Sequence, residues 1–153
     1  MKKGITISIL AITVVLMFIL ATTATVIGVK SIQTASYEEF LSQLSRVSNS
    51  VNKYFIDNRT LPIKSQIVAK EGLPVDLLTE ITNNQDELNN LFVLDMTKIR
   101  VESVNIGKGN TQNMNVFVVA ENTNNIYYLK GVKYKGKTYF GIPIETSLTV
   151  IEE

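Results

Sequence analysis

The side chains that most often perform acid–base chemistry are missing from this 153-residue chain, which has no histidine and no cysteine. Without histidine it has no side chain whose ordinary pKa lies near 7, and no Ser-His or Cys-His arrangement. Without cysteine it has neither a disulfide framework nor a thiolate metal site. Carboxylates stand side by side at Glu38-Glu39, Asp86-Glu87 and Glu152-Glu153, and adjacent residues do not face one another on a helix. These residue types predict that the chain is not an enzyme and uses no cofactor.

Two polar stretches remain as candidate binding loops. Gly107-Lys108-Gly109 lacks the spacing and the Lys-Ser/Thr ending of a phosphate-binding loop, so a turn is predicted there. Residues 107–113 and 121–125 contain no aspartate and only Glu121, which argues against calcium, because its sites rely on carboxylates. The sequence therefore predicts no metal site.

Tyrosines at positions 127, 128, 134 and 139 could form a carbohydrate- or peptide-binding surface. On alternating strands such residues are more often divided between the core and cross-strand pairs, and this is the interpretation we favour. The formal net charge is +1, with neither a basic block nor an acidic tail. Nucleic acid is therefore not directly indicated as a partner.

The most distinctive pattern lies in the first thirty residues. Met1-Lys2-Lys3-Gly4 precedes a run from Ile5 to Val29 that contains no ionisable side chain. About 20 apolar residues suffice to cross a bilayer core, so the run predicts a transmembrane helix. Lys2 and Lys3 place the N-terminus in the cytoplasm by the positive-inside rule. We therefore expect a single-pass membrane protein with an extracellular C-terminal domain.

A short basic leader that ends in glycine, followed by an uninterrupted hydrophobic helix, resembles the prepilin signal of type IV pilins and type II secretion pseudopilins. Lys3-Gly4-Ile5-Thr6 and the run after it are most similar to pilin-like proteins of Gram-positive anaerobes. The resemblance implies that a prepilin peptidase cleaves between Gly4 and Ile5 and that the new N-terminus at Ile5 can be methylated. It also implies that the partners are the membrane, this peptidase and other pilin or pseudopilin subunits.

The chain departs from this family at one position. Pilins that assemble usually carry a glutamate at the fifth mature position, where it pairs with the N-terminal amine of a neighbouring subunit. The residue here is Ile9. The departure implies a minor or tip subunit, or a protein that does not assemble, rather than the bulk subunit of a filament.

Helical spacing continues after the apolar run. Phe40, Leu44, Val47 and Val51 recur at three- and four-residue steps, which predicts an amphipathic helix over residues 30–58. Such a stripe needs an apolar partner, and a sheet formed later in the chain is expected to supply it. Pro62 marks the end of the helix. Residues 59–99 are predicted to form a connecting region with one or two short helices.

The last third, residues 100–153, is rich in β-branched and aromatic residues and predicts an antiparallel sheet. Candidate strands are 100–106, 114–120, 126–130, 132–134 and 138–140, with 142–151 as a further edge strand. Lys135-Gly136-Lys137 predicts a tight turn in which glycine adopts a positive φ.

Together these patterns predict an α+β protein in which a long N-terminal helix packs on an antiparallel sheet of about four strands. Residues 1–4 form the leader and residues 5–29 the transmembrane and assembly helix. The resemblance implies a pilin-like structural subunit of a type IV pilus, a type II secretion system or a DNA-uptake filament, in the membrane or in a surface filament. The alternative is a membrane-anchored extracellular binding module that uses the signal only for export.

Overall fold

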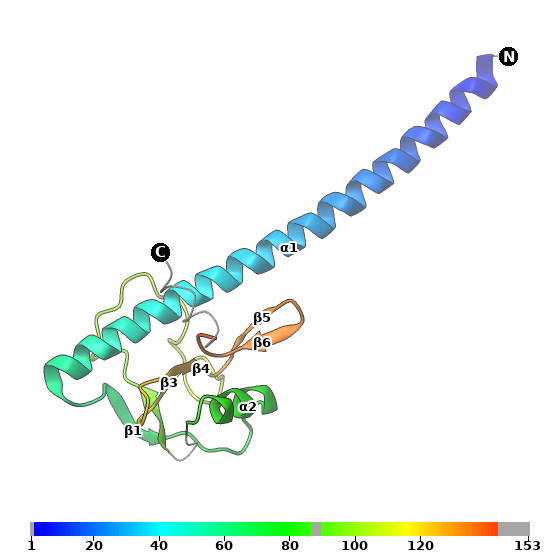
Figure 1. Ribbon diagram of the computed structural model, residues 1–153. Coiled ribbons are helices and arrows are strands. Elements are labelled where there is room, and N and C mark those ends of the chain that lie inside the picture. Colours follow the sequence, from blue (N-terminus) through cyan, green and yellow to red (C-terminus); the bar gives the residue numbers. More distant parts are fainter. Residues whose placement is uncertain (1, 87–89, 144–153) are drawn as a thin grey trace, which may run out of the picture. The chain divides into compact units, whose positions relative to one another are not determined.

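The computed structural model describes residues 2–86 and 90–143, with the side chains of residues 7, 9–21, 28–64, 68–86 and 90–143. The chain divides into two compact units, Met1–Ala35 and Ser36–Glu153. Helix α1, Lys2–Asn58, contributes to both (Figure 1). The first unit consists of the N-terminal part of this helix. The second contains the rest of α1 and all other elements.

Helix α1 ends where its last carbonyls find local partners. Arg59 adopts a left-handed φ of 59°, and its N–H donates a hydrogen bond of 2.8 Å to the Phe55 carbonyl. The Asn58 amide donates to the Tyr54 carbonyl at 2.9 Å. A left-handed residue directly after the helix is a common C-terminal cap. Pro62 follows and favours an extended chain before it.

The second unit contains a four-stranded antiparallel sheet of order β1-β2-β3-β4. Its strands are β1 (Ile63–Ile67), β2 (Leu91–Leu94), β3 (Phe117–Ala120) and β4 (Ile126–Tyr128). Strands β5 (Val132–Tyr134) and β6 (Lys137–Tyr139) form a separate two-stranded sheet. Helix α2 (Val75–Asn83) lies between β1 and β2 in the chain.

The sheet is buried on both faces, between the C-terminal part of α1 and helix α2 (Figure 1). Alternate residues of β3 point to opposite sides: Phe117 and Val119 pack with α1, whereas Val118 and Ala120 pack with α2. This alternation follows from the two-residue period of a strand. It explains why every residue of β3 is buried and apolar.

The helical stripe predicted from the sequence is confirmed. Leu44, Val47 and Val51 have no exposed surface and Phe40 is 2% exposed, and all four pack against residues of β2, β3 and β4. Each fully buried side chain of this size contributes about 1.5–3 kcal/mol. The predicted arrangement of a long helix on a four-stranded antiparallel sheet is therefore correct at this level.

Two of the four strands differ from those predicted. Residues 100–106 form no strand. Instead, Gln43 of α1 accepts hydrogen bonds from the N–H groups of Asn105 at 2.7 Å and Ile106 at 3.4 Å, so a side chain replaces a neighbouring strand as their partner. Strands β1 and β2 lie inside the region 59–99, for which only connecting helices were expected.

The predicted hairpin is correct, although it is not part of the main sheet. Lys135 and Gly136 have φ values of 49° and 80°, which is the pattern of a two-residue hairpin turn with two left-handed positions. Ile142 and Pro143 lie outside any strand, and the rest of the edge strand predicted at 142–151 lies outside the described residues.

A charge placed in the helical stripe tests this packing. Leu44→Asp should lower the free energy of unfolding by at least about 4 kcal/mol, because it removes a buried apolar side chain and buries an unpaired carboxylate. Ser42→Asp introduces the same charge at an exposed position of the same helix and should change stability by less than about 0.5 kcal/mol. Urea unfolding followed by tyrosine fluorescence measures both. Equal effects of the two substitutions would contradict the packing of α1 on the sheet.

Candidate functional site

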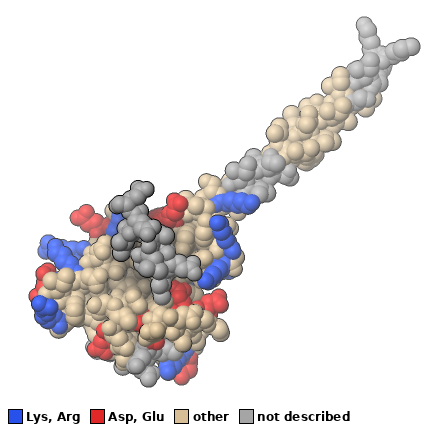
Figure 2. Space-filling view, viewed as in Figure 1, with Lys and Arg blue, Asp and Glu red and all other residues tan. Residues whose placement is uncertain are grey.

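A run of exposed apolar side chains lies on the first unit. Between residues 7 and 17 of α1 its large aliphatic members are between 42% and 69% exposed: Ile7, Ile9, Leu10, Ile12, Val14, Val15, Leu16 and Met17. We call these eight residues the apolar helix surface. They occur at nearly every position, so they surround the helix instead of forming a stripe, and Figure 2 shows no charged atom in this part of it. A helix that is apolar all round normally becomes buried in an apolar environment.

Membrane insertion was the environment expected for Ile5–Val29. Among the residues that the structure describes, however, no helix combines the length and the apolar character needed to cross a membrane. The strictly apolar part of the run is shorter than its uncharged part, since hydroxyl-bearing residues interrupt it at Thr6, Ser8 and Thr13 as well as at Thr22, Thr23 and Thr25. The predictions of a single-pass membrane protein and of its cytoplasmic and extracellular ends are corrected accordingly.

The residues predicted to be processed lie in this unit. Gly4 and Ile5 belong to the backbone of α1, and their side chains lie outside the described set. Ile9 is 59% exposed, and its carbonyl accepts a hydrogen bond of 2.8 Å from the Thr13 hydroxyl. Cleavage between Gly4 and Ile5 stays a prediction.

The second unit contains a polar centre built on Asp86, which is 7% exposed. Its carboxylate accepts hydrogen bonds from the Thr123 hydroxyl at 2.6 Å, the Asn125 amide at 3.1 Å and the Tyr127 hydroxyl at 2.5 Å. The Asn84 amide donates to the Tyr127 oxygen at 2.8 Å. These bonds join the end of α2 to the turn between β3 and β4, and they satisfy both oxygens of the buried carboxylate.

Tyr127 is held as a hydrogen-bond donor in this centre. Burial raises the pKa of its phenol strongly, and the hydrogen bond to Asp86 raises it further. The phenol therefore keeps its proton at every physiological pH. The phenol of Tyr127 stays neutral, and its acceptor, the Asp86 carboxylate, already accepts two other hydrogen bonds. This arrangement suits a structural role better than proton transfer.

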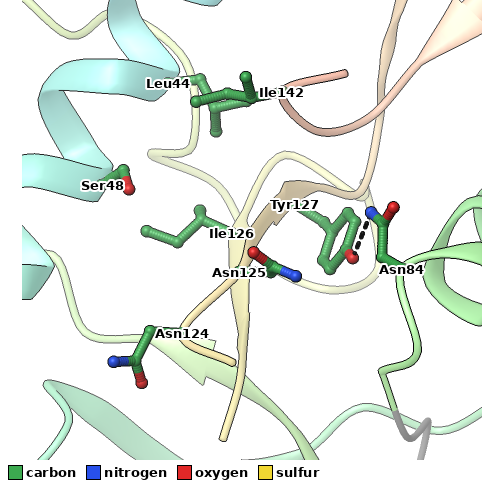
Figure 3. Close-up of a pocket in the computed structure, with 8 residues that line it drawn as sticks. All are labelled: Leu44, Ser48, Asn84, Asn124, Asn125, Ile126, Tyr127 and Ile142. Carbon is green, nitrogen blue, oxygen red and sulfur yellow. Dashed lines mark hydrogen bonds between the residues drawn. The ribbon is translucent and has the colours of Figure 1, made fainter. Parts of the chain in front are cut away.

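A cavity of about 90 Å³ lies beside the polar centre (Figure 3). Its walls come from α1, the end of α2, the β3–β4 turn, β4 and the segment after β6, and the lining residues are Leu44, Ser48, Asn84, Asn124, Asn125, Ile126, Tyr127 and Ile142. None of them carries a charge. The volume fits a few water molecules and is well below the roughly 300–1,000 Å³ of ordinary ligand sites.

Glu80 of α2 connects this helix to the segment after β6. Its carboxylate accepts hydrogen bonds from the N–H groups of Phe140 at 3.3 Å and Gly141 at 2.8 Å. Burial raises the pKa of Glu80, while these two N–H groups and the nearby ammonium of Lys137 oppose the rise. The carboxylate thus anchors the chain where it leaves the hairpin.

The loop around residues 107–115, part of which was considered as a ligand site, uses side-chain oxygens internally. Asn113 Oδ1 accepts the N–H groups of Asn110 and Asn115, each at 3.0 Å. Asn115 Oδ1 accepts the N–H of Gly107 at 2.8 Å and the hydroxyl of Tyr128 at 2.9 Å. Within the described ranges, no three His, Cys, Asp or Glu residues gather where a metal ion could bind.

The four tyrosines divide as the sequence indicated. Tyr127 and Tyr128 are core residues, whereas Tyr134 pairs with Lys137 and Tyr139 with Val132 across the hairpin. Tyr37 of α1, which sequence reasoning did not single out, stacks on Tyr134 with ring centroids 4.4 Å apart. Asp86 was considered only as half of an acidic pair. No local sequence signal links it to its three donors, which follow 37 to 41 residues later.

Removal of the central acceptor tests the structural role of the polar centre. Asp86→Ala leaves three donors without their acceptor and should lower the free energy of unfolding by about 2–4 kcal/mol. Glu121→Ala, in the exposed turn next to the centre, removes a carboxylate that contacts none of these donors and should have little effect. Urea unfolding of both variants provides the measurement, and similar stabilities would show that the centre does not hold α2 to the turn.

No family model, curated protein or solved structure matches the chain.

Proposed function

We propose that this chain is a structural, pilin-like subunit of a filament and that it assembles through the apolar helix surface. The observation that carries the proposal is the exposure of eight large aliphatic side chains around one helix. A patch of this kind on a soluble protein marks an interaction surface. The polymer is of the class formed by type IV pili, type II secretion systems or DNA-uptake systems.

The apolar helix surface can supply the free energy that assembly requires. Complete burial of an aliphatic side chain contributes about 1.5–3 kcal/mol, so the eight residues together reach at least about 12 kcal/mol. Association costs about 4–15 kcal/mol in lost translational and rotational freedom. Apolar helices of other subunits suit this surface because it is apolar all round and can be enclosed by several neighbours at once.

The second unit supports a structural role in another way. The buried polar side chains reported for the described residues are Gln43 and Asp86. Gln43 holds residues 105 and 106, and Asp86 holds the turn before β4. Both fix loops of the folded body, which is consistent with a structural role.

Ile9 favours a minor or terminal position in the filament. After cleavage between Gly4 and Ile5, the amine of Ile5 would be buried among neighbouring helices, and a buried unpaired charge is costly. Ile9 has no group that can neutralise it. At the tip of a filament fewer such amines need a partner, so the chain fits there better than within the body.

Cysteine crosslinking tests the proposal directly, because the chain has no cysteine of its own. Leu16→Cys should yield disulfide-linked products with a matching cysteine in another subunit, or with a second copy, when intact cells are oxidised. Ser42→Cys is the matched control, since it is exposed but lies outside the apolar helix surface. Immunoblotting of non-reducing gels detects the products. Absence of crosslinked species for Leu16→Cys, or equal crosslinking of the control, would count against assembly through this surface.

A further inference from the structure

The β5–β6 hairpin concentrates positive charge that is less evident in the linear sequence. Lys130, Lys133, Lys135 and Lys137 are all exposed, and no acidic residue occurs between Glu121 and Glu145. We call these four side chains the lysine hairpin. Lys135 occupies the turn, and Lys133 faces Thr138 on the opposite side of the ribbon from the Tyr134–Lys137 pair. Lys130 lies just before β5, at the base of the hairpin.

Aromatic rings support two of these lysines. The Nζ atoms of Lys135 and Lys137 each lie 5.1 Å from a ring centroid, over Tyr134 and Tyr139 respectively. Tyr134 is also stacked on Tyr37, with an angle of 1° between the ring planes. The ring of Tyr134 is thus occupied by Tyr37 and Lys135. The cation–π contacts hold the ammonium groups of Lys135 and Lys137 close to the hairpin. Because Tyr37 and Lys135 already contact the ring of Tyr134, this ring is poorly placed to stack on a ligand.

The described carboxylates of the second unit compensate these charges weakly. Within residues 36–86 and 90–143, no carboxylate lies within ion-pair distance of the four ammonium groups. Glu80 is the nearby acid: it interacts electrostatically with Lys137, and its oxygens accept hydrogen bonds from the N–H groups of Phe140 and Gly141. Among the described residues, the ammonium groups of the lysine hairpin are therefore without ion pairs and can contact an external anion.

We propose that the lysine hairpin binds a linear phosphate polymer, such as a nucleic acid backbone or polyphosphate, through charge alone. Lysine binds phosphate as a point charge, and without arginine the hairpin offers no planar fork that would select a particular geometry. A polymer that carries one charge per repeat also releases bound counterions when lysines replace them, which drives association. A single exposed carboxylate gains little from the same contact. The proposal does not depend on filament assembly.

The contacts of the Tyr134 ring bear on whether the hairpin prefers single-stranded or duplex nucleic acid. Proteins that prefer single-stranded nucleic acid place free aromatic faces under the bases. Because Tyr134 is covered by Tyr37 and Lys135, the hairpin should bind duplex DNA at least as well as single-stranded DNA of equal phosphate count. Binding should be independent of base sequence, since phosphate contacts carry no sequence information.

Fluorescence anisotropy with a labelled 30-base-pair duplex and the full chain in a non-ionic detergent tests the proposal. Four lysine–phosphate contacts predict a slope of about −3.6 for log K against log salt, and thus a loss of affinity of about 100-fold between 50 and 200 mM salt. Replacement of Lys133, Lys135 and Lys137 by glutamine should reduce the slope to about −0.9 and weaken binding at 50 mM salt at least tenfold.

Two variants control for net charge and for folding. Replacement of Lys53, Lys70 and Lys108 by glutamine removes three exposed charges from other elements and should leave most of the affinity intact. Replacement of the three hairpin lysines by arginine keeps the charge and should preserve binding. Melting curves identify any variant that fails to fold. If the hairpin glutamine variant does not fold, binding by the hairpin arginine variant decides the test: preserved affinity supports the proposal and lost affinity overturns it.

Competition identifies the source of the phosphate. Displacement of the labelled duplex by unlabelled duplex DNA but not by polyphosphate assigns a nucleic acid partner, and displacement by both assigns phosphate polymers in general. Polyglutamate of equal charge should compete at least tenfold less well. Equal competition by polyglutamate, equal weakening by the two glutamine variants, or no binding at 50 mM salt would overturn the proposal.

Discussion

The structure depends on the burial of one stripe of α1 beneath the four-stranded sheet. Leu44, Val47 and Val51 are completely enclosed there. Strands this short are not stable alone, and a helix of this kind gains most of its stability from packing its apolar face. Each element therefore requires the other. Helix α2 covers the second face of the sheet, and the polar centre at Asp86 joins it to the turn before β4.

The same helix has contrasting surroundings in the two units. From Ser36 onward its apolar residues are concentrated on the face that the sheet covers. At the described positions between residues 7 and 17 of the first unit, apolar residues occupy all sides and are exposed. The first pattern is what a globular domain needs, and the second is what a helix needs when several others surround it. This contrast is why we propose assembly through residues 7–17, while the second unit remains a self-contained folded body.

Parts of the fold could be predicted because their signals are local. The spacing from Phe40 to Val51 indicates a one-sided helix, and Lys135-Gly136 indicates a two-residue turn. Strand β2 was missed because Leu91–Leu94 is apolar at every position, and periodicity cannot separate a strand buried on both faces from part of a helix. Residues 100–106 have strand-like composition, but Gln43 takes the place of a neighbouring strand. The membrane-spanning prediction relied on the absence of charge, which is a weaker criterion than apolar character.

The candidate sites likewise differ in whether a local sequence signal reveals them. The exposed apolar residues are evident in the sequence, although what covers them is not. The polar centre and the stacking of Tyr37 on Tyr134 depend on residues that are distant in the chain, so no local pattern reveals them. The grouping of four lysines around one hairpin likewise becomes clear only when the ribbon and its aromatic supports are seen together.

We propose that this chain is a filament subunit. Quantitative mass spectrometry of sheared and purified surface filaments tests it most directly, by comparing the abundance of this chain in the filament fraction with its abundance in whole cells. We predict that the chain is enriched in the filament fraction but is far less abundant there than the main subunit. Absence of the chain from purified filaments would contradict the proposed function.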